Sequence, residues 1–239
     1  MVIERSFTSI ESAATSLAEE LAACLETAIV RRGCALLAVS GGRTPQYVFS
    51  RLRKLNVDWN RVTVTLTDER WVPTDNPNSN AALVQKFLLQ GAAAAARFVP
   101  MYGGEESPQE GQVACEARLK ALLLPFDAVY LGMGEDGHFA SLFPNDSAVQ
   151  VREGICVAVR EMPSRMARMS LTLPAILEAR NLFILISGYK KLQRYKQAKL
   201  PGSSRELPLR QLLTEDHSSL IVLRVHKNCS EKTHMENLS

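Results

Sequence analysis

Apolar positions along this chain follow two spacings. Across Ile10–Ile29 they recur three and four residues apart, which is the period of an amphipathic helix. The short apolar runs Cys34–Val39, Asp127–Leu131 and Leu182–Ile186 are instead typical of buried strands. Val62–Thr67 alternates strictly between apolar and polar residues, which predicts another strand.

Capping residues predict where several helices begin. Thr8–Glu11 fits a capping box, with Thr8 as the N-cap of the first helix. Thr44 suits the N-cap of the second helix, because Pro45 would then occupy the first helical position. Asn76–Ser79 and Ser107–Glu110 supply the starts of two more helices.

Further strands are predicted at Ile155–Val159, Arg168–Leu173 and Leu220–Val225. Strands that alternate with helices indicate an α/β fold: a doubly wound, Rossmann-like, mostly parallel sheet with helices on both faces. A small extra lobe is compatible with this pattern. We expect a single domain over residues 1–225, followed by a polar, disordered tail over residues 226–239.

The composition narrows the class of protein. The chain has 239 residues, of which 46% are hydrophobic, and a net charge of +3, so we expect neither nucleic acid nor a membrane as partner. Its five scattered cysteines predict reduced thiols in a cytoplasmic protein. We expect no signal peptide at Met1–Ser9, and no apolar run approaches the roughly 18 residues of a membrane helix. No cluster of metal ligands is evident, so no metal is expected.

The turn Ser40–Pro45 (Ser-Gly-Gly-Arg-Thr-Pro) follows a predicted strand and opens a helix. Free backbone N–H groups, the positive end of the helix dipole and Arg43 would converge there, which favours phosphate binding. It lacks the Gly-Lys-Ser/Thr ending of a Walker A loop, and an ordinary tight turn remains the alternative. Three charges at Asp68–Arg70 also follow a strand, which favours a site over a solvated turn.

The loop Gly132–Pro144 combines three glycines with Asp136 and His138 at the end of a buried strand. Histidine moves protons near neutral pH, and Asp136 could orient it. The loop also matches the dinucleotide fingerprint Gly-x-Gly-x-x-Gly, with Glu161 as its distant acid. We reject that alternative because Pro144 would interrupt the required helix and Asp136 would oppose a pyrophosphate.

Taken together, four ordered motifs resemble the 6-phosphogluconolactonase family, which is related to the glucosamine-6-phosphate deaminases. They are Ser40–Pro45, Asp68–Val72, Gly132–Pro144 and Arg168–Pro174, and the resemblance covers about residues 6–225. The fold is expected to be glucosamine-6-phosphate deaminase-like.

The two branches of this family differ after the His-x-Ala sequence. The deaminases typically continue Phe-Asn-Glu-Pro, whereas this chain has Ser141–Pro144 (Ser-Leu-Phe-Pro), so their glutamate has no counterpart. Spacing from Gly188 favours Lys191 over Lys190 as the family's lysine. The lactonase branch is therefore preferred.

The resemblance implies hydrolysis of 6-phospho-D-glucono-1,5-lactone to 6-phosphogluconate in the oxidative pentose phosphate pathway, without a cofactor. The candidate catalytic residues are His138, Asp136 and Arg70. The candidate substrate- and phosphate-binding residues are Ser40, Gly41, Gly42, Arg43, Thr44, Asp68, Arg168 and Lys191. The alternatives are an amino-sugar phosphate deaminase/isomerase and a non-catalytic sugar-phosphate sensor. A monomer or a small homo-oligomer is expected.

Overall fold

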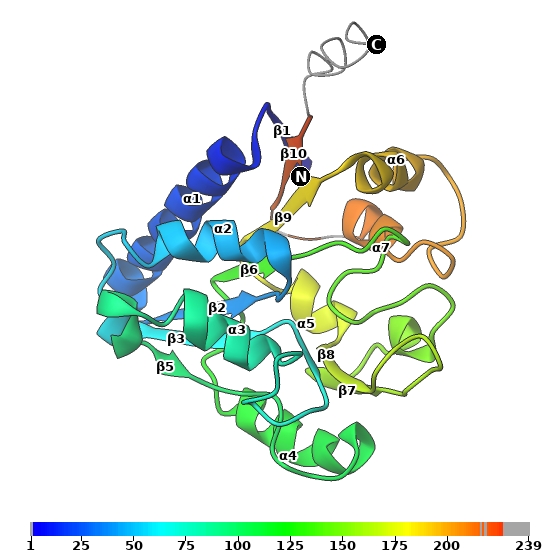
Figure 1. Ribbon diagram of the computed structural model, residues 1–239, viewed down its shortest axis with the longest axis horizontal. Coiled ribbons are helices and arrows are strands. Elements are labelled where there is room, and N and C mark those ends of the chain that lie inside the picture. Colours follow the sequence, from blue (N-terminus) through cyan, green and yellow to red (C-terminus); the bar gives the residue numbers. More distant parts are fainter. Residues whose placement is uncertain (1, 216, 218, 227–239) are drawn as a thin grey trace, which may run out of the picture.

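Seven parallel strands form the central sheet of the computed structural model, which describes residues 2–215, 217 and 219–226 (Figure 1). Their order is β1 (Val2–Phe7), β10 (Leu220–Val225), β9 (Leu182–Ser187), β6 (Ala128–Leu131), β2 (Ala35–Val39), β3 (Val62–Leu66) and β5 (Arg97–Phe98). The predicted doubly wound α/β fold is confirmed. Apart from His226, the predicted C-terminal tail lies outside the described residues.

The helices divide according to the direction in which the chain crosses the sheet. The crossovers that lead toward β5 carry α1 (Ile10–Arg32), α2 (Arg43–Leu52) and α3 (Asn80–Phe87). Those that lead toward β1 carry α4 (Pro108–Lys120), α5 (Leu173–Leu177), α6 (Tyr189–Ala198) and α7 (Leu209–Thr214). Because such crossovers are right-handed, the two groups cover opposite faces of the sheet. The short 3₁₀ helices are η1 (Trp59–Arg61), η2 (Gly91–Ala95) and η3 (Ser147–Gln150).

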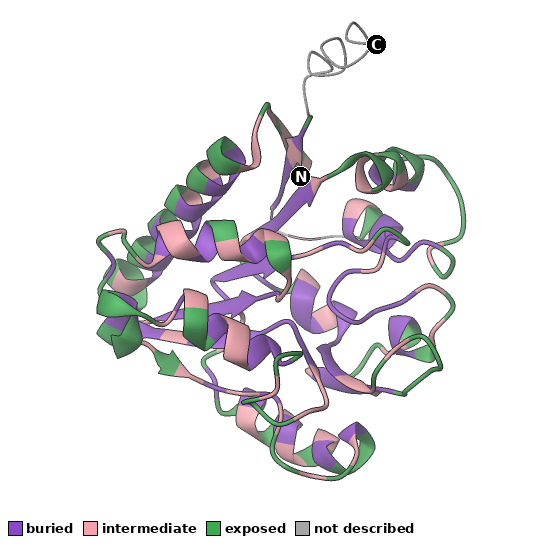
Figure 2. Cartoon of the chain, in the orientation of Figure 1, coloured by how far each residue is buried: buried purple, intermediate pink, exposed green. Residues whose placement is uncertain are grey.

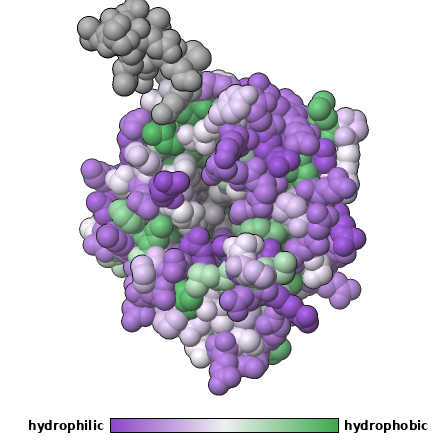
Figure 3. Space-filling model, turned by 45° about the vertical axis from the view of Figure 1, so that its right-hand side comes forward, coloured by the Kyte–Doolittle hydropathy of each residue, from purple (hydrophilic) through white to green (hydrophobic). Residues whose placement is uncertain are grey.

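The core lies between the sheet and these helices, and the sheet strands are largely buried in Figure 2. Every residue of β2 is buried, as its unbroken apolar run predicted. Figure 3 shows a mostly hydrophilic face of the molecule, on which apolar residues are scattered. No described helix has both the length and the apolar character that crossing a membrane requires.

A second, antiparallel sheet consists of β4 (Asp68–Arg70), β8 (Arg168–Leu171) and β7 (Cys156–Val159). The sequence favoured a site at Asp68–Arg70, after a strand, and did not predict that this segment is itself a strand of the small sheet. The chain passes directly from β3 into β4, and the backbone N–H of Leu171 donates to the Thr67 carbonyl at 2.8 Å. This sheet is the small extra lobe that the sequence left open.

Two predicted helix starts are wrong by one or two residues. The N-cap of α1 is Ser9 rather than Thr8, because the Ser9 hydroxyl accepts a hydrogen bond from the backbone of Ser12. Helix α2 begins at Arg43, so Thr44 lies inside its first turn. Its N-cap is Gly42, whose φ of 112° lets the chain turn from the strand straight into the helix. The predicted caps at Ser79 and Ser107 are confirmed.

Two strands were not predicted, β1 and the two-residue β5. Strand β1 pairs with β10 along its whole length, although the two lie at opposite ends of the chain. This pairing supports our proposal that residues 1–225 form one domain.

The strand order reverses direction between β2 and β6. After β2 the chain proceeds toward β5, and after β6 it proceeds toward β1. The loops after these two neighbouring strands run in opposite directions and leave a crevice at the carboxyl edge of the sheet. Open α/β proteins bind their ligands in such a crevice. The two glycine-containing loops predicted from the sequence are the ones that follow β2 and β6.

Candidate active site

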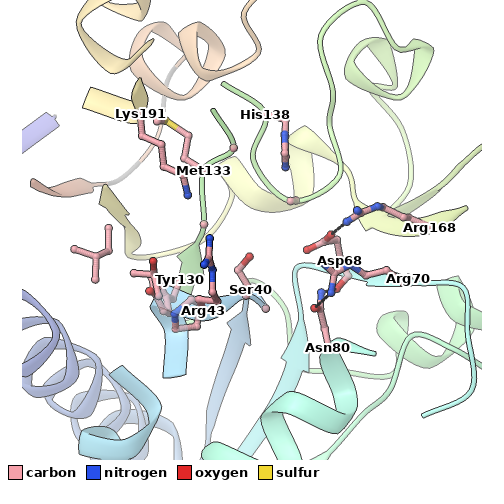
Figure 4. A pocket seen from close by; sticks show the side chains of 18 residues that line it. Ser40, Arg43, Asp68, Arg70, Asn80, Tyr130, Met133, His138, Arg168 and Lys191 are labelled. Atoms are coloured by element: carbon pink, nitrogen blue, oxygen red, sulfur yellow. Dashed lines mark hydrogen bonds and ion pairs between the residues drawn. The ribbon is translucent and has the colours of Figure 1, made fainter. Parts of the chain in front are cut away.

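A cavity of about 210 Å³ lies at this carboxyl edge, between the loops after β2 and β6 and the small sheet (Figure 4). Of the predicted site residues, the cavity is lined by Ser40, Gly41, Gly42, Arg43, Thr44, Asp68, Arg70, His138, Arg168 and Lys191. Asp136 does not line it but contacts His138. Residues more than 150 positions apart in the sequence thus meet around one space.

His138 and Asp136 form a hydrogen-bonded pair. The Nδ1 atom of His138 lies 2.6 Å from Oδ1 of Asp136, which leaves Nε2 as the ring nitrogen for a ligand. The imidazole projects toward the cavity (Figure 4), and its ring centroid lies 4.3 Å from that of Phe143. Burial acts to raise the pKa of Asp136, but the hydrogen bonds and charge of His138 outweigh it, so that pKa is lowered. The carboxylate therefore stays ionised beside the imidazole.

Gly134, in the loop after β6, makes room for this pair. A Cβ atom added at Gly134 would overlap the His138 ring and the Asp136 carboxylate, so only glycine fits there. The loop forms turns rather than a helix, which removes the phosphate-binding helix that a dinucleotide fingerprint needs. Glu161, the acid of that alternative, is exposed in the connection between β7 and β8. The rejection of the dinucleotide alternative agrees with this structure.

The opposite loop presents the N-terminus of α2 to the cavity. The backbone N–H of Ser40 donates to the Tyr130 carbonyl at 3.0 Å, which ties this loop to the end of β6. Arg43 lies in the first turn of α2, and Lys191 extends from the first turn of α6. Burial lowers the pKa of Lys191; the Glu135 charge opposes this shift and the Arg43 charge adds to it. Two neighbouring cations thus share a partly desolvated space that an anion would stabilise.

Lys190 and Lys191 point to different surroundings. Lys191 lines the cavity, whereas the Lys190 ammonium lies 3.3 Å from the Glu135 carboxylate and both side chains are well exposed. The preference for Lys191 rested on spacing alone, and the structure places Lys191 at the cavity.

Asp68 lies at the centre of a buried polar network on the small sheet. Its Oδ2 atom accepts a hydrogen bond from the Ser141 hydroxyl at 2.5 Å and lies 3.4 Å from Nη1 of Arg168. Burial lowers the pKa of Arg168, while the Asp68 charge raises it and the nearby Arg70 charge lowers it. The Arg168 guanidinium also lies 5.4 Å from the centre of the Phe143 ring. These contacts hold Arg168 in a defined position.

Arg70 extends from β4 toward the same space. Its Nη1 atom donates to Oδ1 of Asn80 at 2.7 Å and to the Asn78 carbonyl at 2.9 Å. Asn80 lines the cavity and is almost completely buried, yet the sequence singled out only the caps before it. Ser141 likewise was considered only as a difference from the deaminases. Neither residue carries a local signal of its role, because each acts through partners in another element of the fold.

Known proteins resemble this chain over most of its length. The family model of glucosamine-6-phosphate isomerases/6-phosphogluconolactonase matches residues 8–222. The 6-phosphogluconolactonase of Rhizobium meliloti is 38% identical over 213 residues, covering 87% of this chain and 91% of that protein. The 6-phosphogluconolactonase of Pseudomonas aeruginosa is 40% identical over 205 residues, covering 84% and 86%.

Solved structures show the same architecture. A 6-phosphogluconolactonase from Shewanella baltica superposes with a TM-score of 0.91 at 33% identity, covering 95% of this chain and 98% of that one. A monomeric glucosamine-6-phosphate deaminase superposes with a TM-score of 0.80 at 20% identity, covering 94% and 98%, a likeness that concerns the fold alone. The chain therefore belongs to the glucosamine-6-phosphate isomerase/6-phosphogluconolactonase family, as its four motifs predicted.

Proposed function

We propose that this protein hydrolyses 6-phospho-D-glucono-1,5-lactone to 6-phospho-D-gluconate, a step of the oxidative pentose phosphate pathway. The observation that carries this proposal is the His138–Asp136 pair beside the cavity. Among the described residues, four cationic side chains and one carboxylate line this cavity: Arg43, Arg70, Arg168, Lys191 and Asp68. Such a cavity suits a dianionic sugar phosphate, and a histidine base suits an activated ester. The names of the relatives support the same substrate.

The phosphate binds at the loop after β2. The N-terminus of α2 offers backbone N–H groups and the positive end of its dipole, and Arg43 and Lys191 add charge. Phosphate bound there would relieve the repulsion between these two cations. The lactone ring then extends toward His138.

Hydrolysis proceeds by direct attack of water on the lactone carbonyl. Nε2 of His138 takes a proton from the water as the C–O bond forms, and Asp136 stabilises the resulting imidazolium. Arg70 and Arg168 supply positive charge where the carbonyl oxygen becomes negative. The intermediate collapses when the bond to the ring oxygen breaks, and the imidazolium returns its proton to that oxygen.

Direct attack agrees with the surroundings of the serine nearest to His138 in the loop. The Ser141 hydroxyl is fully buried and donates its proton to Asp68, so it is not available as a nucleophile. An acyl-enzyme through Ser141 is therefore disfavoured.

A coupled assay tests the proposed function. Glucose-6-phosphate dehydrogenase with NADP generates the lactone in situ, and 6-phosphogluconate dehydrogenase reports the product. The full chain should accelerate product formation above the spontaneous rate. Binding of 6-phosphogluconate without acceleration would identify the sensor alternative instead.

The deaminase alternative has a separate test. Phe143 stands at the position of the deaminase glutamate, and its apolar ring packs against His138, so this position offers no acid for ring opening. Release of ammonia from glucosamine 6-phosphate would contradict our proposal. We also propose a cytoplasmic location and a monomer or small homo-oligomer.

A further inference from the structure

We propose that Asn80 is a positioning residue that holds Arg70 in the orientation needed to stabilise the developing oxyanion. The inference rests on the proposed function. Asn80 is the first residue of α3, and its side chain reaches the cavity although only 2% of the residue is exposed (Figure 4). A polar side chain this buried is expected to serve specific partners.

The carboxamide of Asn80 joins two groups of β4. Its Nδ2 atom donates to the Asp68 carbonyl at 2.8 Å, and its Oδ1 atom accepts from Nη1 of Arg70 at 2.7 Å. The carbonyl can only accept and the guanidinium can only donate, so the amide has one possible orientation. Among the described residues, both protein hydrogen bonds of the Arg70 guanidinium use Nη1. Its Nε and Nη2 hydrogens are left for a ligand.

Asn80 is itself fixed by a buried carboxylate. The backbone N–H of Asn80 donates to Oε1 of Glu69 at 2.7 Å, and that of Ala81 donates to Oε2 at 2.8 Å. Glu69 is fully buried at the N-terminus of α3; burial raises the pKa of its carboxyl group, while the backbone N–H groups of Asn80 and Ala81 oppose that rise. The guanidinium of Arg70 is thereby connected to the core through two groups in series, the Asn80 carboxamide and the buried Glu69 carboxyl group.

The same carboxamide also lies against the phosphate loop. A Cβ atom added at Gly41 would overlap the Asn80 side chain, so the two are in close contact. The φ of Gly41 lies outside the left-handed region, so this contact, rather than backbone strain, opposes a side chain there. Asn80 therefore sets the spacing between the phosphate loop and Arg70.

The first test is a double-mutant cycle on kcat/KM with Asn80→Ala, Arg70→Ala and the double variant. We expect a fall of roughly 10- to 30-fold for Asn80→Ala, the size of a lost hydrogen bond to a charged group. The double variant should match Arg70→Ala within about twofold, since Asn80 acts through Arg70. Asn78→Ala is the matched control, because that exposed side chain is removed while its backbone carbonyl remains. Additive effects, or equal activity of Asn80→Ala and Asn78→Ala, would overturn the inference.

The second test uses the contact with Gly41. Gly41→Ala should lower kcat/KM in the wild-type background, because its methyl group displaces the Asn80 carboxamide. In the Asn80→Ala background there is space for that methyl group, and Gly41→Ala should cause little further loss. An equal loss in both backgrounds would show that Gly41 acts independently of Asn80.

Calorimetric binding of 6-phosphogluconate separates this inference from the proposed function. If the wild-type protein binds it without hydrolysing the lactone, the proposed function fails, and the same cycle measured on the dissociation constant still decides whether Asn80 acts through Arg70. If the wild-type protein hydrolyses the lactone and the cycle is additive, only the inference fails. Absence of both binding and hydrolysis would overturn the two together.

Discussion

The two sides of the cavity hold their cations in different ways. On the side of the small sheet, Asp68 and Ser141 surround Arg168, and Asn80 anchors Arg70. On the side of the parallel sheet, the side chains of Arg43 and Lys191 make no hydrogen bond or ion pair with the described residues, and Glu135 acts on Lys191 only through its charge. We call these the fixed side and the open side. Oxyanion stabilisation requires preorganised charge, whereas a phosphate with several equivalent oxygens tolerates mobile cations.

His138 lies between the two sides, and its replacement should have the largest effect. We expect His138→Ala to lower kcat by roughly 10²- to 10⁴-fold, the usual contribution of a general base. Binding of 6-phosphogluconate and the melting temperature should change little, because the phosphate site is retained and the side chain is 26% exposed. Near-normal turnover in the folded variant would exclude His138 as the base.

On the fixed side, Arg168→Ala should reduce both activity and stability. Loss of a cation near the carbonyl oxygen should lower kcat/KM by roughly 100-fold. The free energy of unfolding should fall by about 1–3 kcal/mol, because the buried Asp68 carboxylate loses its cationic partner and keeps only neutral donors. Denaturant unfolding and steady-state kinetics measure the two effects. A stable Arg168→Ala protein would show that this side is not fixed by the ion pair.

On the open side, Lys191→Ala should weaken binding without loss of stability. Removal of one phosphate-binding cation should raise KM by roughly 10-fold. The melting temperature should stay the same or rise, because Arg43 loses a repulsive neighbour. Lys190→Ala is the matched control and should change KM less than about twofold, since its pair with Glu135 is exposed. Equal effects of the two variants would contradict the role of Lys191.

The affinity for 6-phosphogluconate should also depend on pH through Lys191 on the open side, and this effect should be smaller than those of the substitutions. Burial lowers the pKa of Lys191 below its ordinary value of 10.5, so in the free protein this lysine loses its proton at lower pH than an exposed lysine. The affinity for 6-phosphogluconate should therefore decline on the approach to pH 10.5, and binding there should take up a proton. At pH values between the lowered pKa of Lys191 in the folded protein and its ordinary pKa in the unfolded chain, the unfolded chain binds more protons. Lys191 therefore makes the free energy of unfolding rise with pH in that range.

Calorimetry in buffers of different ionisation enthalpy measures this proton uptake. Lys191→Arg should move the decline in affinity to higher pH, because a guanidinium stays charged. If the affinity of the wild-type protein for 6-phosphogluconate does not change between neutral and alkaline pH, Lys191 does not contribute its charge to phosphate binding.

Local patterns predicted most of the parallel sheet and its helices because burial imposes a clear periodicity on them. Strand β1 escaped prediction because charged residues interrupt its apolar pattern. The Glu4 carboxylate is tolerated there because Lys199 and Arg224, nearly 200 or more positions away, pair with it. The chain also supplied no local sign that β4, β7 and β8 would pair antiparallel, since strand partners are selected by tertiary contacts.

The site was predictable where a motif combines backbone and side-chain requirements. Gly134, Asp136 and His138 follow a strand within a few residues, so their proximity could be inferred directly. Asn80 could not be inferred, because an asparagine at a helix start is ordinary. Its role emerges only when the fold brings Gly41 and Arg70 to the same carboxamide.

The most direct test of this account is the lifetime of 6-phospho-D-glucono-1,5-lactone followed by phosphorus NMR. The purified full chain and its His138→Ala variant should be compared at equal concentration. We predict that the wild-type protein shortens the lifetime far below the spontaneous value, while the variant binds 6-phosphogluconate but shortens the lifetime far less at the same concentration. Equal lifetimes with the two proteins would contradict the account, whether both consume the lactone or neither does.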